Sequence, residues 1–162
     1  MIEKRELPYL QRCVVLAAEA LAAGDEPFGS VLVDADGVIR AEDRNRTAGG
    51  DRTRHPEFEL ARWSTTTMTV EERRRATVYT SGEHCPMCAA AHAWVELGRI
   101  VYVSSSAQLS AWLEELGAPA PLVRPLPIAD IAPGVVVEGP VPSLAEQVHD
   151  LHVRFHRGRS GE

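Results

Sequence analysis

Two cysteines three residues apart, where a strand becomes a helix, constrain this chain more than any other feature. Residues 76–82, ATVYTSG, have strand composition, and residues 86–98 have helical apolar spacing. Cys85 and Cys88 therefore lie in the first helical turn, where positions three apart share a face. Backbone N–H groups at a helix start favour thiolate over thiol. The pair suits a metal site or a thioredoxin-like redox site, and two cysteines that only pack are the third interpretation.

A metal site needs another ligand, and the sequence His55-Pro56-Glu57 offers one. Proline is well tolerated in the first helical position, so Pro56 places His55 just before a helix. In a layered fold, two neighbouring strands can lead into helices that start at the same sheet edge, which would bring His55 to the cysteines. Glu57 can face the same site at a helix start, although residues two apart inside a helix point in nearly opposite directions.

Joined in this order, His-x-Glu and Cys-x-x-Cys are more specific than either motif alone. Three protein ligands leave a fourth tetrahedral position for water, which is typical of a catalytic zinc. Zinc can lower the pKa of that water to about 7. Glu57, outside the metal shell, can then pass a proton to a ring nitrogen and a leaving amine. We therefore predict about one zinc per chain on His55, Cys85 and Cys88, and hydrolytic deamination of an amino-substituted heteroaromatic ring.

Helices and strands alternate along the rest of the chain. Apolar spacing predicts helices at 7–23, 55–67, 86–98 and 107–117, and a closing helix that begins at Ser143. Strands are expected at 28–43, as a hairpin turning at Asp36-Gly37, and at 76–82, 99–105 and 121–128. Prolines in the last of these confine it to a sheet edge. This order indicates an α/β layered domain, and we expect residues 1–162 to form a single domain.

Composition narrows the biochemical class. A chain of 162 residues buries roughly 70% of its unfolded surface and needs no metal or disulfide merely to fold. The net charge of −6 argues mildly against a partner held through its phosphates. The charged start leads into no long apolar run, so we expect neither a signal peptide nor a membrane anchor. The three cysteines are an odd number, so we expect them to be reduced thiols in a cytoplasmic protein.

These motifs resemble the zinc-dependent cytidine deaminase superfamily, in the branch of guanine deaminases, cytosine deaminases and tRNA adenosine deaminases. The resemblance covers residues 7–105, and its landmarks are Pro27-Phe28-Gly29, Asn45, His55-Pro56-Glu57 and the hexapeptide EHCPMC at 83–88. It implies a three-layer α/β/α domain around a mixed sheet of about five strands. It also implies zinc on His55, Cys85 and Cys88, proton transfer by Glu57, and a substrate hydrogen bond from Asn45.

The sequence departs from the family's pattern at two positions. Pro56 stands where alanine is usual, and it is compatible with a first helical position. His84 stands where proline is usual, directly before the first cysteine. The fold expectation is unaffected, but the shape of the pocket depends on what His84 does.

The resemblance implies that a free-base deaminase is a homodimer whose site is closed by late segments of the chain. Candidates for contact with the base are Phe28, Gly29, Trp112, Glu114, Glu115 and Phe155. The arginines of the loop 44–54 could contact a phosphate, but acids such as Asp43 and Asp51 are expected to balance them. We therefore expect a small nucleobase substrate, such as guanine, cytosine or an amino-triazine, with neither nucleic acid nor a membrane as partner.

Three alternatives remain open on the sequence. One is tRNA adenosine deamination, and a second is thiol–disulfide exchange without a metal. The third is a zinc-stabilised interaction module, which requires a fourth protein ligand such as His84 or His92. On the closing helix His149, His152 and His156 are expected to form a solvated flank rather than a metal site.

Overall fold

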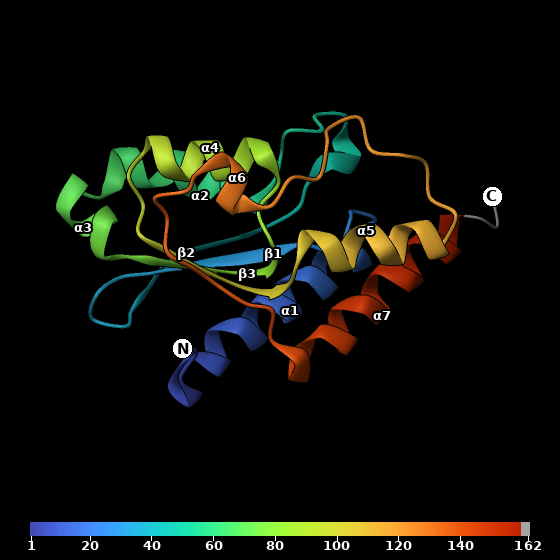
Figure 1. The fold of residues 1–162 in the computed structure, drawn as a ribbon, viewed down its shortest axis with the longest axis horizontal. Helices are drawn as coiled ribbons and strands as arrows, with labels where there is room; N and C mark the ends of the chain where they lie inside the picture. Colours follow the sequence, from blue (N-terminus) through green and yellow to red (C-terminus); the bar gives the residue numbers. More distant parts are fainter. Residues whose placement is uncertain (160–162) are drawn as a thin grey trace.

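The computed structural model describes residues 1–159, and in it a mixed five-stranded sheet lies between two layers of helices (Figure 1). The strand order is β2-β1-β3-β4-β5. The strands are β1 (Gly29–Val33), β2 (Ile39–Arg44), β3 (Thr77–Gly82), β4 (Arg99–Ser104) and β5 (Val137–Glu138). The helices are α1 (Leu7–Ala22), α2 (Pro56–Thr67), α3 (Val70–Arg75), α4 (Pro86–Trp94), α5 (Ser106–Glu115), α6 (Ile128–Ile131) and α7 (Pro142–Arg159), with 3-10 turns η1 (Lys4–Glu6) and η2 (Thr47–Gly49). The predicted three-layer α/β/α architecture is confirmed.

Strand direction brings three loops to one edge of the sheet. β1 is antiparallel to both β2 and β3, with Gly29 opposite Arg44 and Ser30 opposite Thr80. β3 and β4 are parallel, so both end at the edge where β1 begins. The segments before β1, after β2 and after β3 therefore meet there, and these segments carry the predicted site residues.

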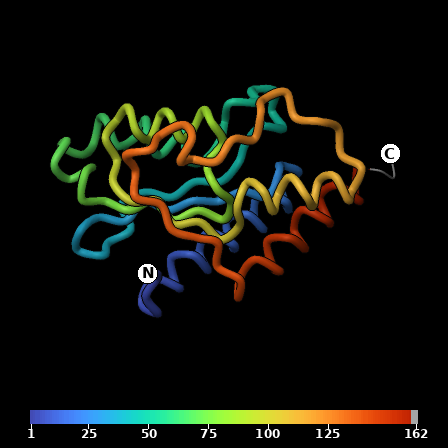
Figure 2. The backbone as a smooth tube through the Cα atoms, in the orientation of Figure 1, coloured from blue at the N-terminus to red at the C-terminus, as the bar shows by residue number. Residues whose placement is uncertain are grey.

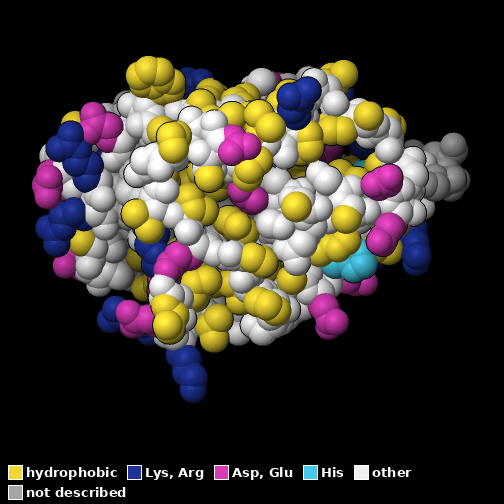
Figure 3. Space-filling view, in the orientation of Figure 1, with side chains coloured by type: hydrophobic (Ala, Val, Ile, Leu, Met, Phe, Trp, Pro, Cys, Tyr) yellow, Lys and Arg dark blue, Asp and Glu magenta, His cyan; other side chains and the backbone are white. Residues whose placement is uncertain are grey.

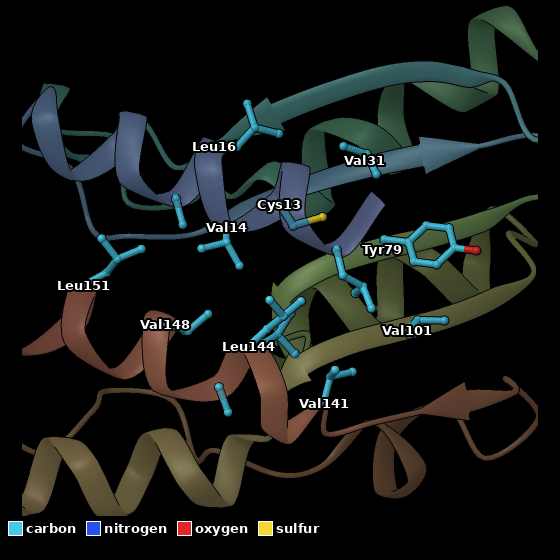
Figure 4. Packing of buried hydrophobic residues seen from close by; sticks show 14 of the residues in the cluster. Cys13, Val14, Leu16, Val31, Tyr79, Val101, Val141, Leu144, Val148 and Leu151 are labelled. Carbon is cyan, nitrogen blue, oxygen red and sulfur yellow. The ribbon is translucent and has the colours of Figure 1, made fainter. Parts of the chain in front are cut away.

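Helices α1, α5 and α7 cover one face of the sheet, and α2, α3, α4 and α6 cover the other (Figure 1). Because both faces are covered, the central strand β1 is buried along its whole length. Figure 4 shows the core on the first face, where side chains of α1 and α7 pack against one another and against the central strands. None of the described helices is long and apolar enough to cross a membrane.

Helix α4 ends at Trp94, four residues before the predicted end at Gly98. Leu97 N–H donates to His92 O at 3.1 Å, and Glu96 N–H donates to Ala93 O at 3.0 Å, with Glu96 in the left-handed region (φ 60°). This is a Schellman end in which glutamate takes the position usually held by glycine. Gly98 serves close packing instead, since a Cβ there would lie 2.5 Å from Ala76 O.

The predicted edge strand at 121–128 is wrong. Three prolines, Pro121, Pro125 and Pro127, remove backbone donors from this segment, so it cannot form a regular ladder. The fifth strand is instead β5, whose Val137 pairs with Ile100 of β4. Figure 2 shows the chain after α5 passing around the sheet edge to α6 in the opposite layer. The last helix begins at Pro142, one residue before the predicted start.

Candidate metal centre and active site

Two helix starts present the metal ligands at the edge where β3 ends. His55 and Cys85 are the N-cap residues of α2 and α4, both with extended backbone, and each is followed by a proline in the first helical position. Proline at that position fixes φ for the helix and lacks only an N–H that would be unpaired anyway. Cys88 follows in the first turn of α4 and is fully buried. The sequence-predicted convergence of two helix starts is confirmed.

The three ligand atoms have the spacing of a zinc site. They lie within 4.8 Å of one another, and His55 Nδ1 is 3.5 Å from Cys85 Sγ and 3.6 Å from Cys88 Sγ. Zn–S and Zn–N bonds of about 2.3 and 2.0 Å at a tetrahedral angle place sulfur and nitrogen about 3.5 Å apart. The donor set and its spacing therefore fit zinc. No fourth His, Cys, Asp or Glu of residues 1–159 joins the group, which disfavours the closed coordination of a structural module.

The environment shifts the pKa values of the two cysteines in opposite directions. A hydrogen bond with Cys88 lowers the pKa of Cys85 most and His55 lowers it further, so that it reaches about 4 although burial opposes this. The same hydrogen bond, together with burial, raises the pKa of Cys88 well above its ordinary value. All three cysteines of the chain are free thiols. Cys85 is thus the thiol of the pair that loses its proton more readily, and a metal ligand must be a thiolate.

Glu57 lies beside the ligands with one carboxylate oxygen anchored. Its Oε1 accepts hydrogen bonds from Ser30 Oγ at 3.0 Å and Thr80 Oγ1 at 2.8 Å. No hydrogen bond from another residue of 1–159 to its Oε2 is present. Burial raises the pKa of Glu57, while the nearby His55 and a hydrogen bond from the Glu57 backbone N–H lower it. The side chain is therefore held firmly through Oε1, and no other described residue binds Oε2.

Asn45 is buried directly after β2, and only part of its side-chain amide is hydrogen-bonded within the fold. Its Oδ1 accepts from Thr47 N–H at 3.0 Å and Thr47 Oγ1 at 2.8 Å, and its backbone N–H donates to Phe28 O at 3.0 Å. The amide NH₂ donates to no residue of 1–159. Asp25 fixes this loop by accepting from Ala48 N–H at 2.8 Å. The Asn45 NH₂ group is thus oriented and available.

Ion pairs neutralise most of the Arg-rich loop, as expected. Arg44 pairs with Asp25 at 2.8 Å, Arg46 with Asp43 at 3.0 Å and Arg54 with Glu59 at 3.6 Å. Arg52 is exposed and forms no ion pair with another residue of 1–159. One unpaired arginine is a weak basis for holding a polyanion.

The remaining predicted substrate contacts are less closely tied to this centre. Gly29 N–H donates to Ser81 Oγ at 3.1 Å, so it is not free for a ligand. Trp112 packs against the α1–α7 core and stacks on His149, with ring centroids 4.7 Å apart. Phe155 is buried on α7. Glu114 and Glu115 are exposed on the last turn of α5 and make no contact with the ligands, so their role stays a prediction.

The histidines depart from expectation. His84 is 1% exposed, and neither of its ring nitrogens has a partner, but it lies outside the metal group and faces His92 at a ring distance of 5.4 Å. His92 Nε2 bonds Gly98 O at 2.7 Å. The expectation of a solvated flank on α7 is wrong for His152, which is 2% exposed. Its ring packs against Phe28 and Trp112, which explains the burial.

Sequence reasoning missed the residues that support the site. Ser30 and Thr80 are fully buried, and Ser30 is a polar residue in the otherwise apolar strand β1, which is the signal that could have found it. Glu83 accepts from the backbone N–H groups of Ser106 at 2.8 Å and Ile128 at 2.9 Å, tying α5 and α6 to the ligand loop. No sequence pattern marks Glu83, because both partners lie far along the chain.

Three curated relatives share part of this sequence. The chain is 29% identical over 121 residues to a probable cytosine deaminase of Schizosaccharomyces pombe, covering 75% of this chain and 74% of that protein. It is 37% identical over 98 residues to guanine deaminase of Bacillus subtilis, covering 59% and 62% of the two chains. It is 33% identical over 95 residues to a tRNA-specific adenosine deaminase of Agrobacterium fabrum, covering 58% and 62%. The chain thus spans less than two thirds of the last two relatives.

The solved structure of guanine deaminase from Nitrosomonas europaea has the same fold. It superposes with a TM-score of 0.70 over 92% of this chain and 83% of that one, at 21% sequence identity. The sequence profile of the cytidine and deoxycytidylate deaminase zinc-binding region matches residues 3–104. That stretch includes both ligand-bearing helix starts and Glu57. The chain therefore belongs to the cytidine and deoxycytidylate deaminase family and carries its zinc-binding region.

Proposed function

We propose that this protein hydrolytically deaminates a free nucleobase or close analogue, such as guanine, cytosine or an amino-triazine, and releases ammonia. The observation that carries the proposal is the half-free carboxylate of Glu57. Its Oε1 is fixed by Ser30 and Thr80, its Oε2 is bound by no other residue of 1–159, and the carboxylate lies within electrostatic range of His55 and Cys88. A carboxylate held in this way is suited to proton transfer rather than to binding the metal.

In this proposal His55, Cys85 and Cys88 hold zinc, which when bound supplies Lewis-acid activation of water near neutral pH. Glu57 takes a proton from the attacking water at Oε2 and delivers it to the ring nitrogen beside the amino-bearing carbon. It then carries the second proton to the departing amine. Asn45 orients the base through its free NH₂ group, and the ring of Phe28 forms a wall of the pocket.

The charge distribution favours a neutral substrate. Arg44, Arg46 and Arg54 are engaged in ion pairs, so the loop that could have clamped a phosphate is mostly neutralised. Figure 3 shows Lys and Arg interspersed with Asp and Glu over the visible face, without a continuous basic surface. A free base needs no phosphate clamp, and its binding releases few counterions.

Side-by-side kinetics on free bases, the matching nucleosides, nucleotides and tRNA test this proposal. We expect ammonia release from at least one aminopurine, aminopyrimidine or amino-triazine base, a much poorer nucleoside, and weak dependence on salt. The alternative is tRNA adenosine deamination, favoured by the similarity to the Agrobacterium enzyme. A nucleotide or tRNA preferred over every free base, with the preference lost in Arg46→Ala or Arg54→Ala, would establish the alternative.

We further propose that residues 1–162 act as one catalytic domain, in a cytoplasmic homodimer. The shared core of α1, α7 and the central strands supports one domain, and three free thiols support a reducing compartment. Trp94 is 86% exposed and flanks an apolar groove of about 550 Å³ between α4 and the segment after α6, which suits a second copy of the chain. Light scattering on Trp94→Glu beside the wild type tests the dimer.

A further inference from the structure

Helix α7 carries a buried imidazole, His152, that has no hydrogen-bond partner among residues 1–159. His152 is 2% exposed and forms no hydrogen bond with another residue of 1–159. Its ring nitrogens nevertheless keep some exposure, because the fully sealed and unpartnered nitrogens of the described chain are those of His84. A neutral imidazole has one donor and one acceptor, and buried polar groups are normally paired. Within residues 1–159, the hydrogen-bonding capacity of the His152 ring is therefore left for solvent or a bound ligand.

Aromatic rings enclose His152. The Phe28 ring lies edge-on at a centroid distance of 5.0 Å, and the Trp112 ring lies at 6.2 Å. Burial, reinforced by His156 and His149, lowers the pKa of His152 to about 3, so the ring is neutral at pH 7. A neutral imidazole flanked by two aromatic rings offers both the flat apolar contacts and the hydrogen-bonding edge that a heteroaromatic base requires.

Phe28 connects this imidazole to the metal centre. Its carbonyl accepts from the Asn45 N–H at 3.0 Å, and its ring would lie 3.2 Å from a Cβ on Gly82, three residues before Cys85. Glu26, two residues before Phe28, is within electrostatic range of both His55 and His156. Phe28 therefore contacts His152 on one side and lies next to Gly82, at the end of the strand that leads to Cys85, on the other.

We propose that His152 is a specificity-determining residue, which hydrogen-bonds the edge of the base that lies away from the departing amino group. This inference rests on the proposed function. In a free base that edge presents N–H and ring-nitrogen groups, and in a nucleoside it carries the sugar. A hydrogen bond from this enclosed position would therefore favour a free base and disfavour its nucleoside.

The test uses three variants on one helix. His152→Phe keeps an aromatic ring and removes both nitrogens, and His152→Gln keeps a donor and an acceptor. His149→Phe is the matched control, because it makes the same change one turn earlier on α7. For each variant, kcat/KM is measured with the preferred base and with the same base N-methylated where a nucleoside carries its sugar. The equilibrium affinity for the deaminated product is measured as well.

We expect His152→Phe to lower kcat/KM for the free base about 5- to 150-fold, chiefly through KM, and to weaken product binding similarly. His152→Gln should retain more activity than His152→Phe, and His149→Phe should match the wild type. N-methylation should cost the wild type more than it costs His152→Phe. Zinc content and the midpoint of thermal unfolding are measured on every variant. Their differences between variants should not match the differences in kcat/KM.

The inference is overturned if His152→Phe and His149→Phe give the same kcat/KM and product affinity, or if His152→Gln falls as far as His152→Phe. In either case an active wild type leaves the proposed function standing. A wild type that deaminates no free base overturns both together. Should His152→Phe not fold, the same comparison of His152→Gln with His149→Phe decides the matter, with a loss confined to His152→Gln as the supporting result.

Discussion

The side chains of the candidate site form two groups: those positioned to bind a metal ion, and those that hold Glu57. The ligands come from two helix starts, each fixed by a following proline. The supports come from two paired strands, where Ser30 lies opposite Thr80. Metal binding and the proton transfer that we propose for Glu57 would therefore depend on different residues, and substitutions can separate them.

Glu57→Gln should retain zinc and lose most activity. The carboxamide keeps the size of the side chain but cannot accept a proton at neutral pH, and loss of general acid–base catalysis costs about 100- to 10,000-fold in kcat. Metal analysis and ammonia release on the same preparation check both halves of this prediction. Loss of the metal in Glu57→Gln, or full activity, would show that Glu57 has another role.

Ser30→Ala should lower kcat about 10- to 100-fold, because it removes one of two hydrogen bonds that fix Oε1 of Glu57. The same substitution made in a Glu57→Gln protein should have little further effect, since the oriented carboxylate is already gone. A double-mutant cycle on kcat measures this coupling. Additive losses would mean that Ser30 acts independently of Glu57.

Prediction from sequence succeeded for the positions that are encoded locally. His55, Cys85 and Cys88 come together as predicted because helix starts and spacing place them, whereas the role of Glu57 stays a prediction. Ser30 was missed because its partner Glu57 lies 27 residues further along the chain. His152 was misjudged because its burial depends on Phe28 and Trp112, which lie far from it in the sequence.

At the scale of elements, the packing of α1 against β1 decides where the Glu57 support lies. Gly29 allows this approach, because a Cβ there would lie 2.4 Å from Leu16 Cβ and 2.6 Å from Cys13 O. The next residue along β1 is Ser30, so a displaced strand would also disturb the carboxylate. The element therefore couples core packing to the active site.

Gly29→Ala should lower the free energy of unfolding by about 1–3 kcal/mol or more, because the added methyl meets helix backbone that cannot move aside. Gly49→Ala is the matched control, since a Cβ there would meet nothing within 4 Å and it should change stability by less than about 0.5 kcal/mol. Urea unfolding of both variants measures the difference. Equal stabilities would contradict the close approach.

Elements with strong periodicity were predicted closely, including α1, α2 and the hairpin. Element ends were harder, because α4 stops at a Schellman turn built on Glu96 that composition does not mark. The segment 121–128 failed because its apolar residues resemble a strand while its prolines prevent pairing. Leu122, which is 91% exposed, shows that the apolar residues of this segment do not alternate between a buried and an exposed face as they would in a strand.

Across the whole molecule, an ion-pair network closes the sheet edge opposite the metal centre. Arg99 of β4 donates to both Glu6 and Glu138, and the amino group of Met1 donates to Glu138. Glu6 also accepts from Tyr79 Oη at 2.7 Å and from Glu3 N–H at 2.7 Å. The network joins the start of the chain to strands β3, β4 and β5.

Stability at low pH should depend on Glu6. Burial alone would raise its pKa, but hydrogen bonds from Arg99, Glu3 and Tyr79 lower it from 4.5 to about 2. A depressed pKa stabilises the fold above about pH 4.5 and that contribution is lost as the pH falls toward 2, by up to about 3 kcal/mol. Glu6→Gln should therefore be less stable than the wild type at pH 7, with a smaller gap at pH 3.

Urea unfolding at the two pH values measures that gap. The control is Glu3→Gln, whose exposed ion pair with Arg5 should contribute less than about 1 kcal/mol. A gap between Glu6→Gln and the wild type that is unchanged from pH 7 to pH 3 would contradict the role assigned to Glu6.

The decisive measurement for zinc-dependent deamination is ammonia release from free bases, followed as the zinc content is varied. We predict about one zinc per chain. We also predict activity that falls in proportion as a chelator removes the metal, and recovers when zinc is restored. Cys88→Ser, which alters a ligand, should show both low zinc and low activity. Undiminished deamination by metal-free protein, or zinc-loaded protein that releases ammonia from no base, would contradict the account.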